Sequence, residues 1–541
     1  MGDVSEFGAS GREHRGHQRG GEEAKASTML AGWRKAMPIG RWTSEEAKAC
    51  ASTLEGAAQA GLVRAQGFIH GEWRDATDGA TLSVDNPATG ETVQQVAKMG
   101  ARETVEAIAS ARDAFTTWKR KTAHERAAVL WRWHDLIHEN REHLAAILTS
   151  ENGKPISEAR AEIRSGMGSI TWSAEEAKRV RGDVLEPPMR NRRNVVMKQP
   201  VGVVGAITPW NFPMSMVTRK VAPALAVGCT VVLKPSELTP LSALALAELA
   251  NRAGMPPGVL NVVMGDAPAI GRTILKSPDV KKIGFTGSTA VGKMLMAGAA
   301  ETVKKVSLEL GGNAPLLVFD DADLEKAAAA AATSAFRNAG QTCICAARIL
   351  VQEGVHDRFV ELLAHHANST RLGNGMDSSV TTGPLITPAA IQRVDEHVSD
   401  AVAKGAKVVA GGKKRDGVGN FYHPTVLSGV SLDTRVHMEE TFGPLAPVFK
   451  FKDEEEAIRI ANDTPYGLAA YFFTSDLARG WRVAEALDYG MVGLNEVGFT
   501  HESIPFGGVK ESGLGREGSS YGLDDFLEIK FVCMGLGYEK R

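Results

Sequence analysis

The strongest candidate for a reactive side chain in this sequence is Cys343, in the run Gln341-Thr-Cys343-Ile-Cys345. The run follows an alanine-rich helical stretch that ends in Asn338-Ala-Gly340, so Cys343 is predicted where a helix gives way to a loop. A thiolate in such a loop can act as a nucleophile. Free cysteine is among the most often buried residue types, so a structural role in the core is the alternative for Cys343 taken alone.

Two polar residues upstream strengthen the catalytic interpretation of Cys343. Glu309-Leu-Gly-Gly312 closes an apolar strand candidate, and a carboxylate at a strand end is well placed for acid–base chemistry. Thr208-Pro-Trp-Asn-Phe-Pro213 ends another candidate strand, where two prolines restrict the backbone and let the Asn211 amide project as a donor for an oxyanion. Alone, Asn211 is equally well explained as a turn residue.

A glycine-rich turn provides a candidate nucleotide site. Gly284-Phe-Thr-Gly287-Ser-Thr-Ala-Val-Gly292 follows a strand candidate and opens a helix, so its N–H groups can face a pyrophosphate. Lys234-Pro-Ser-Glu237 ends a neighbouring strand candidate, where both charged side chains can bind ribose hydroxyls. The turn lacks the standard G-x-G-x-x-G spacing, and such a turn is more often a simple loop.

Short apolar runs and helical stretches alternate between residues 201 and 320, which predicts a parallel sheet of β-α-β units. The strand candidates are Val201–Ile207, Thr230–Leu233, Val259–Met264, Lys282–Phe285, Val303–Leu308 and Pro315–Phe319. A second α/β domain is predicted from further candidates near Arg348–Gln352, Lys407–Ala410 and Pro447–Phe451. A hairpin is expected over residues 67–79, and helices are expected over residues 101–182.

Composition favours a small-molecule partner. The 541 residues carry a formal charge of −2, which is too little to hold nucleic acid or an anionic membrane surface. The 5 cysteines are too scattered for a disulfide framework, and this indicates a reducing compartment. No apolar run approaches the ~20 residues that a membrane helix needs.

Residues 1–58 are expected to form a flexible N-terminal extension, because they are rich in Gly, Arg, His and Glu without periodicity. Their acidic residues oppose mitochondrial import from Met1, whereas a start at Met29 would leave a basic, apolar leader typical of import. The expected compartment is therefore either mitochondrial or cytoplasmic.

The motifs occur together in the order found in the aldehyde dehydrogenase superfamily, which the chain resembles from about Leu62 to Leu536. The resemblance implies that Cys343 is the nucleophile, Glu309 the base and Asn211 the oxyanion donor. It implies NAD as cofactor, with NADP possible. The residues that it assigns to cofactor binding are Trp210, Lys234, Pro235, Ser236, Glu237, Gly287, Ser288, Thr289, Gly292, Glu440 and Phe442.

The same resemblance implies an α/β fold with a Rossmann-like cofactor domain, an α/β catalytic domain and a small bridging β-sheet. The expected segments are a cofactor domain over 59–181 and 201–310, a catalytic domain over 311–524 and bridging segments over 182–200 and 525–541. A homodimer or homotetramer is expected.

A narrower resemblance is to succinate-semialdehyde dehydrogenases, through residues 336–345, Thr218-Arg-Lys220 and the tail from Gly513-Leu-Gly-Arg-Glu-Gly518 through Leu527-Glu-Ile-Lys530. It implies that Arg219 and Arg337 bind a substrate carboxylate, as a pair of guanidinium groups can. The stretch Asn495-Glu-Val-Gly-Phe-Thr-His-Glu-Ser503 differs from the loop that supplies a substrate-binding serine in that family. Thr500 is expected to supply the hydroxyl instead, and bulky Phe499 and His501 beside it leave the exact aldehyde open.

The expected substrate is succinate semialdehyde, in the degradation of γ-aminobutyrate (GABA). The alternatives are glutarate semialdehyde, a broad range of aliphatic aldehydes, a CoA-acylating reaction and a non-enzymatic use of the fold. Glu309 favours water over CoA as acyl acceptor. Cys345 lies two residues from Cys343, and a reversible disulfide between them is a further expectation.

Two other patterns carry no chemistry. Gly518-Ser-Ser-Tyr-Gly522 fits the hydrolase motif G-x-S-x-G, but no histidine follows His501 to complete a Ser-Asp-His order. His134 and His138 lie one helical turn apart without the H-E-x-x-H pattern, so a solvated helix face is the better interpretation and no metal is expected.

Overall fold

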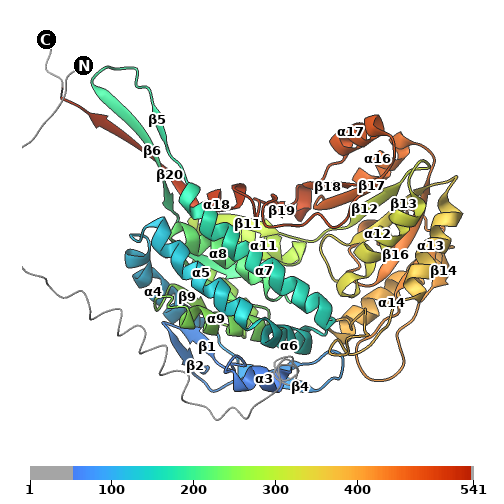
Figure 1. Cartoon of the computed structure of the whole chain (residues 1–541), viewed down its shortest axis with the longest axis horizontal. Coiled ribbons are helices and arrows are strands. Elements are labelled where there is room, and N and C mark those ends of the chain that lie inside the picture. Colours follow the sequence, from blue (N-terminus) through green and yellow to red (C-terminus); the bar gives the residue numbers. More distant parts are fainter. Residues whose placement is uncertain (1–52, 538–541) are drawn as a thin grey trace, which may run out of the picture. The chain divides into compact units, whose positions relative to one another are not determined.

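The structure is a computed structural model that describes residues 53–537 (Figure 1). Most of the predicted N-terminal extension, and the possible leader from Met29, lie outside the described residues. The predicted boundary at residue 58 is wrong, because it falls inside helix α3 (Leu54–Gln59). Thr53 caps this helix, and Leu54 and Ala57 pack against the core.

An eight-stranded sheet forms the first domain, with strand order β19-β11-β10-β7-β8-β9-β1-β2. Its central strands are parallel, and the antiparallel hairpin β1–β2 and strand β19 form its edges. Its strands are β1 (Gly67–Ile69), β2 (Glu72–Arg74), β7 (Val203–Ile207), β8 (Thr230–Lys234), β9 (Leu260–Val262), β10 (Val280–Thr286), β11 (Lys305–Glu309) and β19 (Gly513–Leu514). The predicted parallel sheet is confirmed. Strand β19 pairs with β11 in this sheet, although it lies within residues 311–524, the segment predicted to form the catalytic domain.

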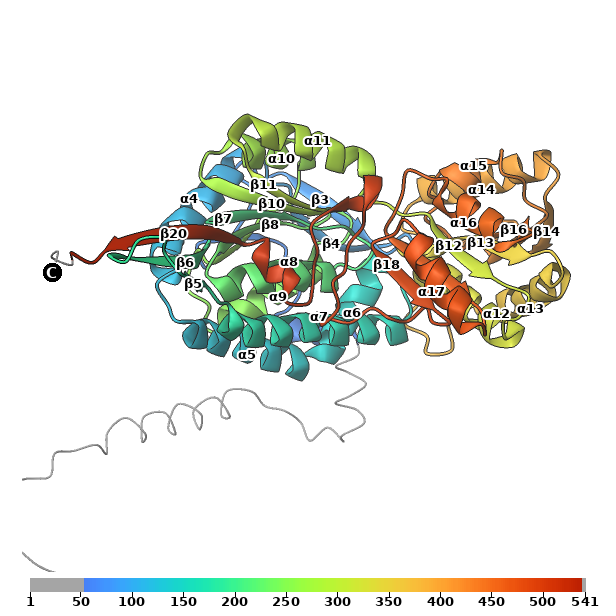
Figure 2. The ribbon, with the colours of Figure 1, turned by 90° about the horizontal axis from the view of Figure 1, so that it is seen from above.

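Helices cover both faces of this sheet, with α10 and α11 on one side and α8 and α9 on the other (Figure 2). Helix α8 is buried on almost all sides, which matches its apolar sequence. The helices predicted over residues 101–182 are confirmed by α4 to α7. The helices are α4 (Ala101–Trp118), α5 (Ala123–Glu139), α6 (Arg141–Asn152), α7 (Ile156–Glu176), α8 (Ser215–Val227), α9 (Leu241–Arg252), α10 (Ala267–Lys276), α11 (Thr289–Ala299) and α18 (Tyr521–Asp524). A separate ribbon pairs β3 (Thr81–Asp85) with β4 (Thr92–Ala97).

A seven-stranded sheet forms the second domain, in the order β14-β15-β16-β13-β12-β17-β18. Its strands are β12 (Ala314–Val318), β13 (Ala346–Gln352), β14 (Lys407–Ala410), β15 (Thr425–Ser428), β16 (Leu445–Phe451), β17 (Ala469–Phe473) and β18 (Met491–Leu494). Its helices are α12 (Leu324–Phe336), α13 (His356–Asn368), α14 (Pro388–Ala403), α15 (Arg435–Met438), α16 (Glu454–Asn462) and α17 (Leu477–Ala486). The predicted second α/β domain is confirmed, although the sequence analysis did not identify β15, β17 and β18.

A three-stranded arm projects from the first domain (Figure 1). It pairs β6 (Arg192–Pro200) with β5 (Asp183–Leu185) on one side and with β20 (Leu527–Gly535) on the other, all antiparallel. These strands come from the two segments predicted to bridge subunits. Apolar side chains on the arm are exposed, including Val184 at 76% and Ile529 at 72%.

Candidate active site

Cys343 lies in a tightly built loop between α12 and β13. Asn338 and Ala339 adopt left-handed backbone conformations, with φ of 50° and 53°, and turn the chain sharply after the helix. A Cβ atom on Gly312 would lie 2.3 Å from the Cys343 carbonyl oxygen. Glycine is therefore needed at this position, because the connection between β11 and β12 passes directly against the cysteine loop.

The Cys343 side chain borders two cavities. The larger one, of about 1090 Å³, is also lined by Asn211, Glu440 and Phe442. The smaller one, of about 440 Å³, is also lined by Arg219, Arg337 and Thr500. The cysteine thus stands at the junction of the regions that the sequence analysis assigned to cofactor and to substrate.

Burial raises the pKa of the Cys343 thiol to about 12, and the nearby Glu440 and Glu309 carboxylates contribute to this increase. At neutral pH the residue is therefore a thiol. It requires a proton acceptor when it attacks a substrate.

Glu309 ends strand β11, and its buried carboxylate, whose charge acts on the Cys343 thiol, is the candidate for this acceptor. One oxygen, Oε2, has no hydrogen-bond partner among the described residues. Burial and the neighbouring Glu517 carboxylate raise the Glu309 pKa well above its usual range, against the opposing charges of Lys220 and Arg219. When ionised, Glu309 is therefore a strong base.

A charged cluster behind Glu309 contains two residues, Lys220 and Glu517, to which the sequence assigned no function. The Lys220 ammonium, 2% exposed, forms an ion pair with Glu517 Oε1. Arg219 Nε lies 3.9 Å from the other oxygen of the same carboxylate. A signal was available, because the adjacent charged residues Arg219 and Lys220 interrupt a largely apolar helix and a fully buried lysine requires a partner.

Asn211 is the candidate oxyanion donor, and it lies in the wall of the larger cavity beside Cys343. Its side chain is buried, and its Nδ2 donates to the Gln341 carbonyl oxygen at 3.0 Å. Asn211 lines the larger cavity, and a primary amide carries two N–H donors, so one remains beyond the hydrogen bond to Gln341.

The candidate substrate cavity gathers residues from three distant parts of the chain. Arg219 comes from α8, Arg337 follows α12 and Thr500 lies in the loop after β18. The Arg219 guanidinium lies 4.5 Å from the ring centroid of Phe506, and that of Arg337 lies 5.4 Å from the ring centroid of Phe212. Arg219 is nearly buried, whereas Arg337 is exposed.

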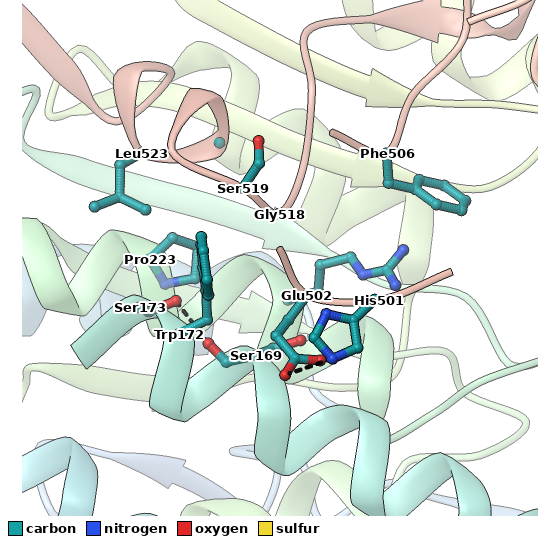
Figure 3. Close-up of a pocket in the computed structure, with 12 residues that line it drawn as sticks. Ser169, Trp172, Ser173, Pro223, His501, Glu502, Phe506, Gly518, Ser519 and Leu523 are labelled. Carbon is teal, nitrogen blue, oxygen red and sulfur yellow. Dashed lines mark hydrogen bonds and ion pairs between the residues drawn. The ribbon is translucent and has the colours of Figure 1, made fainter. Parts of the chain in front are cut away.

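The bulky residues around Thr500 point away from this cavity. Phe499 packs on Tyr471, with 5.6 Å between ring centroids. His501 lines a separate cavity of about 360 Å³ with Trp172 and Ser519, and its Nε2 pairs with Glu502 at 3.2 Å (Figure 3). Neither ring lines the cavity next to Cys343, so neither blocks it.

The candidate nucleotide turn joins the end of β10 to the start of α11. Ser288 caps the N-terminus of α11 by accepting a hydrogen bond from the Val291 N–H at 3.5 Å. Gly287 and Ser288 line the larger cavity with Trp210, while Thr289 lines an adjoining cavity with Glu440. Gly292 and the turn over residues 234–237 are not among the residues that line the larger cavity.

The candidate nicotinamide end contains Glu440 and Phe442. The Glu440 carboxylate accepts the Gly312 N–H at 2.9 Å, and burial raises its pKa to about 7. Phe442 meets Trp210 edge to face at 5.5 Å. Arg393 of α14 also lines this cavity and was missed from the sequence, because nothing in its local pattern distinguishes it from a surface arginine.

At the candidate ribose site, Lys234 and Glu237 form an ion pair of 2.6 Å instead of remaining separate. Burial opposes ionisation of Glu237, but the charge of Lys234, its hydrogen bond and a backbone hydrogen bond together outweigh burial and lower the pKa of the carboxyl. The Glu237 side chain is 46% exposed and remains accessible to a ligand. Ser236, which follows Pro235 in the same turn, accepts the Leu238 N–H at 3.3 Å.

Cys345 is buried, and its Sγ donates to the Ala335 carbonyl oxygen at 3.6 Å. Both Cys343 and Cys345 are free cysteines. Between residues 53 and 537, no group of three or more His, Cys, Asp and Glu side chains could hold a metal ion. Within the same range, none of the helices combines the length and apolar character that crossing a membrane requires.

Comparison with known proteins agrees with this arrangement. Residues 73–532 match the model of the aldehyde dehydrogenase family. The chain is 58% identical to a mitochondrial succinate-semialdehyde dehydrogenase of Arabidopsis thaliana, over 90% of this chain and 92% of the relative. It is 54% identical to an NADP(+) succinate-semialdehyde dehydrogenase of Escherichia coli, over 88% and 98% of the two chains.

Among solved structures, a betaine aldehyde dehydrogenase of Staphylococcus aureus in complex with NAD+ superposes with a TM-score of 0.87 at 34% identity. The match covers 90% of this chain and 98% of that chain. The predicted fold and the predicted class of nicotinamide-dependent oxidoreductase are confirmed. The protein therefore belongs to the aldehyde dehydrogenase family.

Proposed function

We propose that this protein oxidises succinate semialdehyde to succinate through a thioester on Cys343, with NAD as hydride acceptor. The observation that carries the proposal is the position of Cys343 at the junction of two cavities, one of which contains Arg219 and Arg337. A neutral aldehyde would have no use for two cations beside the nucleophile.

The residues of the larger cavity fit a dinucleotide. Gly311 lines it beside Glu440, and a Cβ atom there would lie 2.8 Å from the Glu440 carboxylate, so the absence of a side chain keeps this space open. Glu440 and Phe442 would hold the nicotinamide end, and the N-terminus of α11 would face the phosphates. Bound there, the nicotinamide ring supplies the acceptor for the hydride that the substrate carbon loses.

The protein's own groups perform the remaining steps. The Cys343 sulfur bonds to the aldehyde carbon while its thiol proton passes to the Glu309 carboxylate. The carbonyl oxygen becomes an oxyanion that accepts hydrogen bonds from the Asn211 amide and the Cys343 N–H. Loss of hydride leaves the thioester on Cys343.

Hydrolysis then completes the reaction. Glu309, after releasing the first proton to solvent, removes a proton from a water molecule whose oxygen bonds to the thioester carbon. The carbon–sulfur bond breaks, the acid leaves and Cys343 recovers its proton.

We propose NAD as the preferred cofactor because the accessible Glu237 carboxylate would bind a ribose 2′-hydroxyl and repel a 2′-phosphate. NADP remains the alternative, since the Escherichia coli relative is named for it.

The proposed assembly is a homodimer or homotetramer formed through the arm. Exposed apolar side chains such as Val184, Ile529 and Phe531 (56%), on a sheet with open edges, favour burial against another subunit. Sedimentation of the wild type and of Phe531→Glu tests this, because a smaller particle is expected for the variant. The proposed compartment stays mitochondrial or cytoplasmic; the Arabidopsis relative is named as mitochondrial.

The experiment that tests the activity is NADH formation with a panel of aldehydes, in the presence and absence of CoA. We expect the highest kcat/KM with succinate semialdehyde and no dependence on CoA. A preference for glutarate semialdehyde or a neutral aliphatic aldehyde would redirect the substrate assignment. Dependence on CoA would identify an acylating enzyme, and no turnover with any aldehyde would favour a non-enzymatic use of the fold.

A further inference from the structure

A buried ion pair lies beside the candidate active site and takes no part in the proposed chemistry. Lys154 Nζ contacts Glu162 Oε2 at 2.7 Å, and the two side chains are 0% and 1% exposed. Lys154 lies in the connection between α6 and α7, and Glu162 lies in α7. Burying two charges is costly, and an apolar pair of similar volume is often as stable, so such a pair calls for a role other than stability.

The Lys154 ammonium makes a second contact that connects the pair to the site. It donates to the backbone carbonyl oxygen of Asn211 at 2.7 Å. Asn338 Nδ2 donates to the same oxygen at 3.0 Å. Two donors therefore hold the peptide group that links Asn211 to Phe212. Because this restrains the Asn211 backbone, it also restricts the direction in which the Asn211 side-chain amide points.

The same ammonium also contacts Phe212, an aromatic residue that lines the substrate cavity. Lys154 Nζ lies 4.1 Å from the centroid of the Phe212 ring, and the Arg337 guanidinium lies 5.4 Å from it. Phe212 lines both cavities that meet at Cys343. Lys154 thus contacts two consecutive residues, Asn211 and Phe212, at the point where the oxyanion would form.

Glu162 extends the connection to the start of α8. Its Oε1 accepts the N–H groups of Met214 at 2.9 Å and Ser215 at 3.1 Å. These residues begin the helix that carries Arg219. Glu162 also lines the substrate cavity, where its charge is balanced by Lys154.

We propose that Lys154 is a positioning residue for the oxyanion: its ammonium, anchored by Glu162, holds the Asn211 peptide so that the Asn211 amide faces the oxygen of the reacting carbonyl. A second consequence is that Lys154 neutralises Glu162 at the cavity wall, so that an anionic substrate is not repelled. The proposal rests on the proposed role of Asn211.

The test compares Lys154→Met with Lys304→Met. Lys304 is also buried and donates to two backbone carbonyl oxygens, those of Ser277 and Val280, but contacts none of the active-site residues. With butyraldehyde, where substrate charge plays no part, we expect Lys154→Met to lower kcat by about 10- to 100-fold with little change in KM, because small misplacement of a catalytic group has effects of this order. Lys304→Met should retain wild-type kcat.

A second readout separates positioning from general damage. Alkylation of Cys343 by iodoacetamide forms no oxyanion, so its rate, followed by mass spectrometry of the Cys343 peptide, should stay within about twofold of wild type in Lys154→Met. If alkylation slows as much as turnover, the variant has disturbed the cysteine loop and the proposal is overturned.

The double variant Lys154→Met/Glu162→Gln is decisive, because it removes the ammonium without leaving an unpaired buried charge and is the variant most expected to fold. We expect kcat to stay low, while KM for succinate semialdehyde recovers relative to Lys154→Met. Recovery of kcat to the wild-type value would refute the role of the contact with Asn211. Asn211→Ala separates the proposed oxyanion role of Asn211 from the proposed positioning role of Lys154. If Asn211→Ala leaves kcat unchanged, the oxyanion role of Asn211 is wrong, whatever the result for Lys154.

Discussion

Arg337→Ala is the most informative test of the substrate assignment. Both arginines line the candidate substrate cavity, but Arg219 also acts on the catalytic groups: its charge opposes the raised pKa values of Glu309 and Cys343. Removing Arg219 would therefore change the pKa of the base and of the nucleophile, and so the rate with every aldehyde. Arg337 is not among the main causes of either shift, so its removal is the more direct test of substrate recognition.

The expected magnitude follows from the environment of Arg337. Losing one hydrogen bond to a charged group typically costs about 1.5–3 kcal/mol, or roughly 10- to 150-fold in kcat/KM. Arg337 is exposed, and solvent weakens such contacts, so we expect the lower end of this range, about 10-fold, for succinate semialdehyde. Butyraldehyde has the same number of carbons and no carboxylate, and its kcat/KM should barely change.

The assay is initial-rate NADH formation with both aldehydes for wild type, Arg337→Ala and Arg337→Lys. The lysine variant keeps the charge without the two-pronged geometry and should fall between the other two. A parallel loss with both substrates would refute the reasoning, since Arg337 would then support the cysteine loop instead of contacting the substrate. If butyraldehyde is the better substrate of the wild type, the semialdehyde assignment itself is wrong.

Three further predictions concern the cofactor, the thiols and the base. Wild type should have higher kcat/KM with NAD than with NADP, and Glu237→Gln should narrow this difference because it removes the charge that repels a 2′-phosphate; a wild-type preference for NADP would contradict the assignment. Mild peroxide should inactivate the wild type reversibly, because a disulfide between Cys343 and Cys345 would be strained and easily reduced, and Cys345→Ala should lose less activity. Equal losses of activity in the two proteins that dithiothreitol does not restore would exclude this switch. Burial and the Glu517 charge raise the pKa of Glu309, and only its ionised form accepts a proton, so kcat should rise with pH through this raised pKa. Glu517→Gln should move that rise to lower pH, and an unchanged pH profile would argue against Glu309 as the base.

Local sequence patterns were sufficient to predict many individual elements of this protein. The strand candidates that became β7, β8, β10, β11 and β12 were identifiable because short apolar runs between turn and helix signals are typical of parallel strands. The position of Cys343 after a helix and of Glu309 at a strand end followed from the same local patterns. Strands β15 and β17 escaped detection because buried strands such as Ala469–Phe473 lack the alternation that separates a strand from a buried helical segment.

Only the tertiary structure decided which of these residues meet. Arg219 and Arg337 are separated by more than a hundred positions, yet they share a cavity because α8 and the end of α12 converge on it. The side-chain direction of Phe499, away from that cavity, depends on its packing against Tyr471 and not on its neighbours in sequence. Lys154 lies in a polar, turn-like stretch of sequence that is typical of a surface lysine, and only tertiary packing buries it against Asn211. Local patterns specify elements, whereas contacts between distant segments arise from the packing of whole domains, which no local pattern encodes.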